Sequence, residues 1–461
     1  MTWLEFRDRV CADGMAALPA HVVRLRAAPS EVAALQQAGL SRLLDHAVRH
    51  SPFHRARLAG VDIRTISATD LTALPVMTKE QMMSSLDDVF TDSRLTRARV
   101  EQALAETEET PVPIDGEFLA LATGGSTGRR AIITYDVPGL VGYLCSLARP
   151  MAARLQEVAG DGPVPTLTLA MVAAASAKHA TQAMAHFAAG TLPFRFDHVP
   201  ATLPLPDIVA QLNTSQPPAL MGYASMIYRL AAEQRAGRLQ ISPLSVSATS
   251  ESLDTAMRDA ITEAFGIPVV NTFGSTEGLV GATPPGGDAI VFNTDLCIVE
   301  LVDDEYRPVE TGVPSSRILL TNLYNLTQPL IRYEITDRFR QVTDPNGTGL
   351  LNAVVHGRAE EILRYGAVEI HPHAVTTVMV GAPQVVDYQV HQTVGGLRIA
   401  VVTEPGFDDD LLADTLRASL GRAGLSDAKV EVRRVEELPR DEKTGKVRRF
   451  NPLPRTDGLN A

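Results

Sequence analysis

The sequence predicts an α/β fold with a large domain and a small C-terminal one. A chain of 461 residues is longer than one ordinary core accommodates, which predicts two or three domains. Between about residues 115 and 280, short apolar runs such as LALAT, TLTLAMV, PFRFDHV, PALMGY and PVVNTF alternate with amphipathic stretches such as LDTAMRDAITEAF. This alternation is typical of mixed or parallel sheets covered by helices. The last hundred residues change to the order α-β-β-α-β, which indicates a small α+β unit.

The same patterns set the expected domain boundaries. Residues 1–110 are predicted to be the helical part of the large domain, because Leu40, Leu43, Leu44 and Ala47 recur at helical spacing. Residues 111–357 are predicted to form the α/β core. Within it, turn sequences such as PPGGD and TDPNGTG indicate a small β-rich subdomain at about 285–355. Residues 358–461 form the predicted C-terminal α+β lid domain.

Composition narrows the classes of function. The net charge of -12 argues against a sequence-independent nucleic-acid binder, which needs a basic face, but a nucleotide-binding enzyme needs only a few local cations. The three cysteines, Cys11, Cys145 and Cys297, form no CxxC pair, which supports neither a zinc knuckle nor a disulfide scaffold. The N-terminus MTWLEFRDRV lacks an apolar signal core, and the apolar run near residues 164–177 is too short to span a membrane. We expect a cytoplasmic protein without nucleic-acid or membrane partners.

The stretch LATGGSTGRRAIITYD, residues 121–136, predicts a phosphate-contacting loop between two strands. Glycines let the backbone approach an anion closely, and the hydroxyls of Ser126 and Thr127 can donate to phosphate oxygens. A Walker A loop is excluded because no lysine follows the last glycine and the next segment alternates like a strand. From these residues alone, a glycine-rich hairpin without a ligand is an equal alternative.

Four further segments follow this loop in a fixed order: NTFGSTEG (271–278), PLIRYEITD (329–337), HGRAEEILRYG (356–366) and LPRDEKTGKVRR (438–449). The ordered set resembles the adenylate-forming superfamily of acyl- and aryl-CoA ligases, adenylation domains and luciferases. The segments SRLLDHAVRHSPFHRARLAG and LPVMTKEQM resemble its phenylacetate–CoA ligase branch. The resemblance covers roughly residues 35 to 450.

The resemblance implies a mobile lid and roles for individual residues. The implied catalytic residues are Lys446 on the lid, Thr276 at the α-phosphate and Glu277, which would hold Mg²⁺. Glu360 occupies the hinge position, where the family normally has aspartate. Asp337, expected to end the strand that contains Tyr333, would accept hydrogen bonds from the ribose hydroxyls. The implied ATP- or AMP-binding residues are Thr123, Gly124, Gly125, Ser126, Thr127, Gly128, Ser250, Glu251, Asn271, Thr272, Phe273, Gly274, Ser275, Thr276, Asp337 and Arg358.

By the same resemblance, an acyl pocket lies among small and apolar residues, which predicts an uncharged aromatic or medium-sized acid. Its implied members are Ala174, Lys178, His179, Gly222, Tyr223, Ala248 and Gly278.

The expected function is ATP- and Mg²⁺-dependent activation of a small carboxylic acid as an acyl-adenylate, with release of pyrophosphate and transfer to coenzyme A. Two alternatives remain at this stage. The acyl group could pass to a carrier-protein thiol or an amine, or the chain could be a nucleotide-binding homologue that has lost catalysis. A homodimer is expected by family analogy alone.

Overall fold

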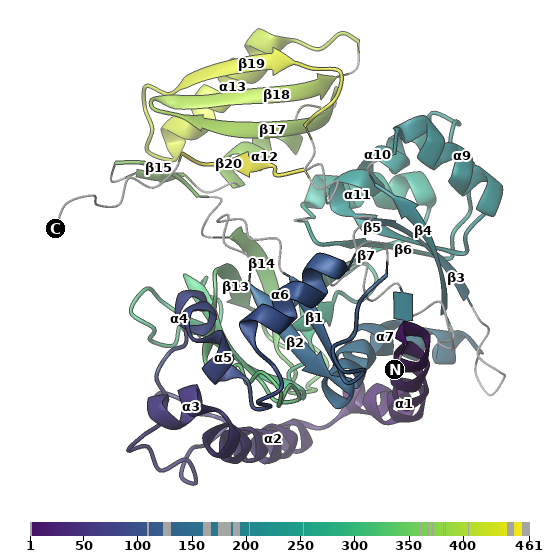
Figure 1. Cartoon of the computed structure of the whole chain (residues 1–461). Coiled ribbons are helices and arrows are strands. Elements are labelled where there is room, and N and C mark those ends of the chain that lie inside the picture. Colours follow the sequence, from purple (N-terminus) through teal and green to yellow (C-terminus); the bar gives the residue numbers. More distant parts are fainter. Residues whose placement is uncertain are drawn as a thin grey trace.

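The computed structural model describes residues 2–107, 110–122, 131–159, 167–173, 186–187, 194–201, 203–251, 253–358, 362–366, 368–370, 373–380, 382, 384–403, 405–439 and 447–453 (Figure 1). The described helices are α1 (Trp3–Val23), η1 (Arg24–Arg26), α2 (Pro29–His50), α3 (Pro52–Arg57), α4 (Lys79–Ser84), α5 (Leu86–Val89), α6 (Arg97–Glu106), α7 (Val137–Ala159), α9 (Leu205–Ser215), α10 (Ala224–Arg235), α11 (Thr255–Phe265), α12 (His373–Val380) and α13 (Asp409–Arg422). The described strands are β1 (Phe118–Ala122), β2 (Ile132–Asp136), β3 (Leu167–Ala173), β4 (Phe194–Pro200), β5 (Ala219–Tyr223), β6 (Ser245–Thr249), β7 (Val269–Gly274), β8 (Val280–Ala282), β9 (Ile290–Phe292), β10 (Cys297–Val302), β11 (Arg317–Asn322), β12 (Tyr333–Ile335), β13 (Asp337–Gln341), β14 (Asn352–Arg358), β15 (Leu363–Tyr365), β16 (Val368–Ile370), β17 (Val385–Thr393), β18 (Gly396–Thr403), β19 (Lys429–Arg434) and β20 (Phe450–Asn451).

Helices dominate the chain before β1, as the leucine spacing predicted. Helix α1 begins at a capping box, in which the Thr2 hydroxyl accepts from the Glu5 N–H and the Glu5 carboxylate accepts from the Thr2 N–H. Helix α2 buries Leu40, Leu43 and Leu44 in a cluster that also holds Ile298 of β10. Helix α2 therefore packs against the β-rich part of the molecule, whereas α1 packs against α7.

A nine-stranded mixed sheet in the order β13-β14-β9-β8-β7-β6-β5-β3-β4 is the centre of the large body. Strands β4, β3, β5, β6 and β7 run parallel, and β7, β8, β9, β14 and β13 follow as antiparallel neighbours. Helices α9, α10 and α11 pack on the parallel half and share one buried cluster with it (Figure 1). The structure thus confirms the α/β class and the mixed sheets covered by helices.

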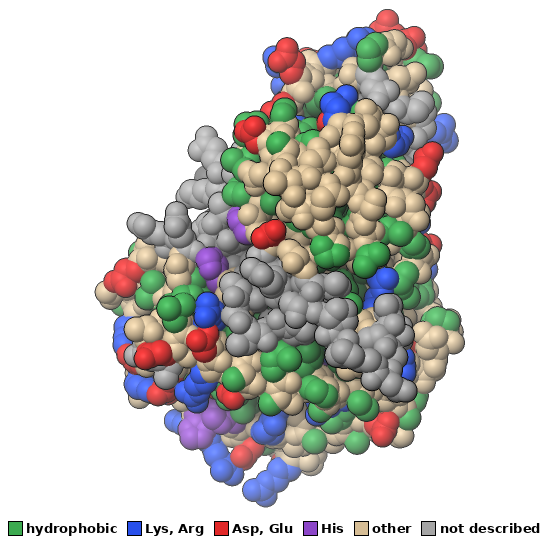
Figure 2. All heavy atoms as spheres, turned by 90° about the vertical axis from the view of Figure 1, so that its right-hand side faces the viewer, with side chains coloured by type: hydrophobic (Ala, Val, Ile, Leu, Met, Phe, Trp, Pro, Cys, Tyr) green, Lys and Arg blue, Asp and Glu red, His purple; other side chains and the backbone are tan. Residues whose placement is uncertain are grey.

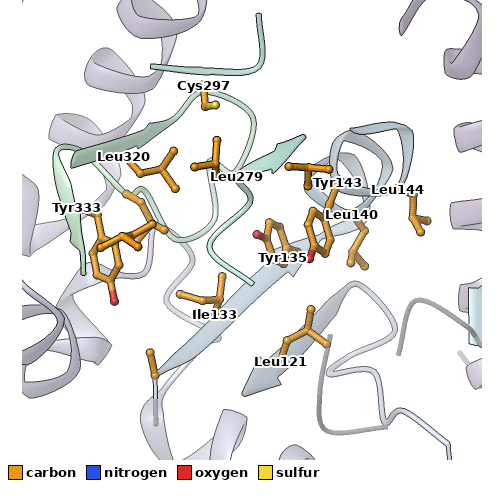
Figure 3. Close-up of a cluster of buried hydrophobic side chains, with 14 of the residues drawn as sticks. Leu121, Ile133, Tyr135, Leu140, Tyr143, Leu144, Leu279, Cys297, Leu320 and Tyr333 are labelled. Atoms are coloured by element: carbon orange, nitrogen blue, oxygen red, sulfur yellow. The ribbon is translucent and has the colours of Figure 1, made fainter. Parts of the chain in front are cut away.

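Smaller sheets accompany the central one. Strands β1 and β2 form an antiparallel pair on either side of residues 123–130, as the glycine-rich stretch predicted. Strands β10, β11 and β12 form an antiparallel three-stranded sheet. The hydrophobic cluster between β2, α7 and the turn before β8 includes Leu121, Tyr135, Tyr143 and Leu279 (Figure 3).

One detail of the strand prediction was wrong. Asp337 does not end the strand that contains Tyr333, because β12 ends at Ile335 and Asp337 begins β13. The reason is a change of sheet at Thr336: β12 pairs with β11 in the three-stranded sheet, whereas β13 pairs with β14 in the nine-stranded sheet.

The C-terminal elements form a separate layer at the top of Figure 1, with a four-stranded sheet in the order β19-β18-β17-β20 and helices α12 and α13. The predicted order α-β-β-α-β corresponds to α12, β17, β18, α13 and β19. The sequence did not indicate β20, which pairs parallel with β17 at Val390 and His391. We call residues 363–453 the lid; its domain boundaries remain a prediction.

The surface charges, the helices and the cysteines each bear on an expectation drawn from the sequence. On the face shown in Figure 2, basic and acidic side chains are interspersed. None of the helices in the described ranges combines the length and apolar character needed to cross a bilayer. Cys11, Cys145 and Cys297 are all buried free thiols.

Candidate active site

The carboxyl ends of three parallel strands bring predicted site residues into one row. Gly222 on β5 lies opposite Ala248 on β6, and Ala248 lies opposite Asn271 on β7. In the next row, Tyr223, Thr249 and Thr272 are aligned in the same way. Ligands of open α/β sheets bind outside the carboxyl ends of the strands, so this register places adenine-contact and acyl-pocket candidates at one edge.

The turn between β7 and β8 carries Thr276 and Glu277. The N–H of Ser275 donates to the carbonyl of Leu279 at 2.9 Å, and the N–H of Gly278 donates to the carbonyl of Ser275 at 3.0 Å. Gly278 has a φ of +103°, and a Cβ there would overlap the side-chain amide of Asn322. The last glycine of NTFGSTEG is therefore required by backbone conformation and by close packing.

Four consecutive carbonyls of this turn accept hydrogen bonds from side chains of the surrounding core. The donors are the hydroxyl of Tyr143 to Ser275 (3.1 Å), the hydroxyl of Tyr135 to Thr276 (2.7 Å), the amide of Asn322 to Glu277 (2.9 Å) and the hydroxyl of Tyr324 to Gly278 (2.9 Å). We call these four side chains the carbonyl clamp. Because every carbonyl of the turn is held, the clamp fixes the direction in which Thr276 and Glu277 leave the backbone.

The rings of the clamp stack on one another. Tyr135 and Tyr143 have centroids 5.5 Å apart and an interplanar angle of 3°, and Figure 3 shows them side by side. Burial, and then the neighbouring hydroxyls and the Glu277 carboxylate, raise the pKa of Tyr135 well above its ordinary value. The hydroxyl therefore stays protonated and remains a donor to the turn.

An aromatic trio connects this turn to Asp337. Phe273 meets Phe292 and Phe339 edge-on, each with centroids 5.4 Å apart, and Phe339 lies on β13 two residues after Asp337. Asp337 is only 8% exposed and is the register partner of Arg358 on β14. The structure thus brings the predicted adenine-stacking and ribose-binding positions toward one end of the central sheet.

Two predicted nucleotide contacts occupy the bend after β6. Ser250 adopts a left-handed φ of +63°, which is uncommon for a residue with a side chain. The Glu251 carboxylate accepts hydrogen bonds from the Ser225 N–H at 2.9 Å and from the Val447 N–H at 3.2 Å. Sequence reasoning assigned Glu251 to the nucleotide pocket and did not find its contact with the lid.

Several predicted residues have no described side-chain environment. The glycine-rich loop residues Thr123 to Gly128, the pocket residues Ala174, Lys178 and His179, the hinge residue Glu360 and the lid residue Lys446 lie outside the described residues, as does the side chain of Arg358. Their roles remain predictions. Of the other pocket candidates, Tyr223 and Ala248 are fully buried in the cluster beneath the parallel strands.

Sequence reasoning also missed the carbonyl clamp. Asn322 and Tyr324 lie in the run TNLYNLT, residues 321–327, where an apolar strand gives way to amides and an aromatic residue. That polar run after a buried strand was the available signal. Their partners, however, lie 45 and 46 residues earlier in the chain, which no local pattern reveals.

The chemistry of Glu277 fits the predicted magnesium ligand. Magnesium prefers oxygen donors and is commonly held by one or two carboxylates together with substrate phosphates. Glu277 provides one carboxylate on a turn whose backbone is fixed. Within the described ranges, no group of three or more His, Cys, Asp or Glu residues is arranged as a metal site.

Comparison with known proteins gives one curated relative and a set of similar structures. No family model matches the chain. The protein CapK of Staphylococcus aureus is 24% identical over 285 residues, which are 59% of this chain and 55% of CapK. The chain therefore matches about half the length of that relative.

Several solved structures are similar to this chain, and one ligase is similar over nearly its whole length. A 2-hydroxyisobutyryl-CoA ligase in the postadenylation state, in complex with an acyl-adenylate, has a TM-score of 0.68 at 18% identity, covering 92% of this chain and 89% of the ligase. The chain has the fold of this ligase. The same ligase in the thioesterification state, with adenylate and CoA, gives a TM-score of 0.55 at 19% identity, covering 92% of this chain and 90% of the ligase. The ATP-bound RpMatB-BxBclM chimera B3 also shares the fold, with a TM-score of 0.52 and 17% identity, covering 70% of this chain and 65% of the chimera.

Proposed function

We propose that this protein uses ATP to activate a carboxylic acid as an acyl-adenylate and then transfers the acyl group to the thiol of coenzyme A. The observation that carries the proposal is the convergence of the parallel strand ends, the clamped turn with Thr276 and Glu277, and the aromatic trio beside Asp337. The clamped turn and Asp337 belong to two of the segments on which the family resemblance rests, NTFGSTEG and PLIRYEITD, and these lie far apart in the sequence.

The chemistry proceeds in two steps. In the first, a carboxylate oxygen attacks the α-phosphate of ATP, a new P–O bond forms, and the bond to the β-phosphate breaks with release of pyrophosphate. In the second, the thiol sulfur attacks the acyl carbonyl carbon, loses its proton, and AMP leaves. Because the first step joins two anions, the site must neutralise charge and align the reactants.

We assign separate parts of this charge neutralisation and alignment to four residues. Thr276 donates its hydroxyl to the α-phosphate, Asp337 accepts from the ribose hydroxyls, and Lys446 supplies a cation to the carboxylate and α-phosphate. Glu277 would hold magnesium, which would offset phosphate charge when bound. The turn that carries Thr276 and Glu277 is rigid because its carbonyls are already occupied by the clamp.

The acid is uncharged beyond its carboxylate. The row of Gly222 and Ala248 at the strand ends offers small, apolar groups. Both positions are closely packed and neither provides a partner for a second charge, so the choice of an aromatic or medium-sized acid rests on the family resemblance.

Pyrophosphate release tests the first step. Purified protein with ATP and Mg²⁺ is given acetate, 2-hydroxyisobutyrate, benzoate or phenylacetate, and the release is compared with a reaction without acid. We expect at least one aromatic or medium-sized acid to raise the rate well above that background, and chelation of magnesium to abolish the increase. No acid-dependent release with any of them would favour a nucleotide-binding homologue without catalysis.

Mass spectrometry of the products tests the acceptor. With CoA present, we expect the acyl-CoA thioester and AMP. An acyl-adenylate that accumulates and that CoA does not discharge would instead assign the second step to a carrier-protein thiol or an amine.

A further inference from the structure

The contact between Glu251 and Val447 joins the large body to the lid at a particular place. Glu251 follows β6, and its two carboxylate oxygens are divided between two backbone donors: Oε2 accepts from Ser225 in the first turn of α10, and Oε1 accepts from Val447 of the lid. A carboxylate at a helix N-terminus is stabilised by the free N–H groups and the helix dipole. Glu251 is thus held on the body side by α10 and offers its other oxygen to the lid.

Val447 is the residue directly after Lys446 in the sequence. Val447 is buried, with 6% of its surface exposed. Consecutive Cα atoms are about 3.8 Å apart, so an anchor on the Val447 N–H restrains the backbone from which the lysine side chain extends. The hydrogen bond therefore lies one residue from the proposed catalytic cation.

A half-buried cation lies two residues after Val447, close to the same junction. Arg449 bonds Asp387 at 3.2 Å and lies over the ring of Tyr388 at 4.4 Å, and all three belong to the lid. Burial by itself lowers the pKa of Arg449, but Asp387 and Tyr388, followed by Glu251 and Asp254 of the body, raise it overall. The carboxylates of two body residues thus help to keep this lid cation charged.

A second ion pair links the same two parts at their periphery. Arg229 on α10 pairs with Glu437 of the lid at 3.2 Å, with side-chain exposures of 17% and 63%. An ion pair with one partner so exposed contributes little, because water screens it. The Glu437 pair is therefore a natural control for the Glu251 contact, since both join α10 and the lid and both involve one carboxylate.

We propose that Glu251 is a positioning residue that docks the lid for the first half-reaction, so that Lys446 is presented to the adenylation site and withdrawn when the contact breaks. The proposal deepens the proposed function and rests on it. The arrangement in which the contact is made superposes better on the postadenylation state of the 2-hydroxyisobutyryl-CoA ligase (TM-score 0.68) than on its thioesterification state (0.55), at equal coverage of this chain.

Glu251→Gln tests this role by separating the half-reactions. Glutamine keeps one acceptor oxygen but cannot accept from both backbone donors, and it removes the charge that faces Arg449. With the acid that gives the fastest pyrophosphate release, we expect kcat for adenylation to fall about 10- to 100-fold, as for a lost charge-assisted hydrogen bond. KM for ATP should change less than about threefold, because the residue acts through the lid rather than on the nucleotide.

Controls and a conservative variant accompany that measurement. Thiolysis of a supplied acyl-adenylate by CoA should be nearly unchanged in Glu251→Gln. Glu437→Gln, which breaks the exposed pair, should keep both half-reactions within about twofold of wild type. Glu251→Asp retains the charge on a shorter side chain and should fall between wild type and Glu251→Gln. It also provides a measurable variant if Glu251→Gln does not fold.

Backbone hydrogen exchange measures the docking contact without requiring catalysis. Backbone amides of residues 447–453 should exchange faster in Glu251→Gln than in wild type, and Glu437→Gln should leave them unchanged. Equal exchange in Glu251→Gln and wild type would overturn the docking role, and so would an equal loss of both half-reactions. In either case, acid-dependent pyrophosphate release by the wild type would leave the proposed function standing. Failure of that release in the wild type would instead remove the proposed function.

Discussion

At the scale of single residues, side-chain hydroxyls and amides define the site by holding backbone carbonyls. The carbonyl clamp holds the backbone of the turn that carries Thr276 and Glu277, the two residues for which we propose contacts with ATP and magnesium. Tyr135 makes the shortest of the four contacts, at 2.7 Å to the Thr276 carbonyl, and is fully buried. It is therefore the member whose hydroxyl is most directly tied to the position of Thr276.

We expect Tyr135→Phe to lower adenylation more than it lowers stability. Loss of one buried hydrogen bond costs about 1 kcal/mol of unfolding free energy, and the ring packing is retained. The freed Thr276 carbonyl lets the turn shift, so acid-dependent pyrophosphate release should fall about tenfold, as expected for about 1.4 kcal/mol of lost transition-state stabilisation. Tyr306→Phe, which removes a hydroxyl bonded to Glu334 away from the turn, should leave the rate unchanged. Equal rates in Tyr135→Phe and wild type would show that the clamp does not position the turn.

A second residue-scale prediction concerns pH. His54 is fully buried, and its Nε2 lies 3.0 Å from the Pro329 carbonyl, so that nitrogen carries the proton. Burial, and then the Arg57 cation, lower the pKa of His54 to about 3. The unfolded chain, with a pKa near 6.5, binds more protons below that pH. The stability that neutral His54 contributes is therefore present above about pH 6.5 and is lost as the pH falls toward 3.

Urea unfolding at pH 7 and pH 5 measures this dependence. His54 should lower the unfolding free energy by about 2 kcal/mol between those values, and His54→Gln, which keeps a donor toward Pro329, should remove that share. The exposed His50→Gln is the matched control and should retain the wild-type difference. A pH dependence that is the same in His54→Gln and wild type would contradict the assignment.

At the scale of elements, helix α7 is fixed to the central sheet in spite of a proline inside it. Pro150 has no N–H to donate to the Ser146 carbonyl, and the side-chain amide of Asn293 occupies that carbonyl at 2.8 Å. Arg149, the neighbouring residue, forms a bidentate pair with Asp295 at 2.8 and 2.5 Å, with both side chains fully buried. Because α7 carries Tyr143, these contacts position one donor of the clamp.

We expect Arg149→Met to destabilise the protein by about 3–5 kcal/mol, because it leaves the Asp295 carboxylate buried without its partner. The double variant Arg149→Met with Asp295→Leu removes both charges and should recover most of that loss. Thermal or urea unfolding of the three proteins measures it. A double variant that is no more stable than Arg149→Met would mean that packing, and not the unpaired charge, causes the loss.

The sequence predicted elements whose burial follows from their own composition. It missed elements and contacts that depend on pairing with distant segments. The apolar runs of β3, β5 and β7 are buried by their own composition, so the parallel sheet was predictable. Strand β6 has the sequence SVSAT, in which serine and threonine hide its burial, and β20 contains only two residues. The change of sheet at Thr336 and the contact of Glu251 with Val447 depend on pairing between distant segments, which local patterns do not encode.

At the scale of the whole molecule, the order of the motifs predicted the fold. The placement of the lid relative to the large body determines which half-reaction a lid variant is expected to affect. The row at the strand ends, the clamped turn and Asp337 occupy one sheet, whereas the lid lies on the other side of the Glu251 contact. With the proposed cation Lys446 on the lid and the proposed magnesium ligand Glu277 on the body, we expect adenylation to depend on where the lid is placed and thiolysis not to depend on Lys446.

Lys446→Ala should therefore have an asymmetric effect. Loss of a charge contact in the adenylation transition state costs a few kcal/mol, so acid-dependent pyrophosphate release should fall by about two orders of magnitude or more. Thiolysis of a supplied acyl-adenylate should be largely spared. Lys443→Ala, three residues earlier, is the control for general loss of lid charge, and an equal loss of both half-reactions in Lys446→Ala would refute the lid-lysine assignment.

The change of sheet at Thr336 couples two sheets through a single residue. Side chains alternate between the two faces of the sheet along β13. Phe339 meets Phe273 because it lies on the face of β13 that its present spacing from Thr336 gives it. One extra residue between Ile335 and Asp337 would invert that alternation, turning Phe339 away from Phe273 while leaving β12 in register with β11. Insertions at this junction would therefore be far less tolerated than insertions in the neighbouring turns, and the spacing between Tyr333 and Asp337 acts as a length constraint on any functional variant.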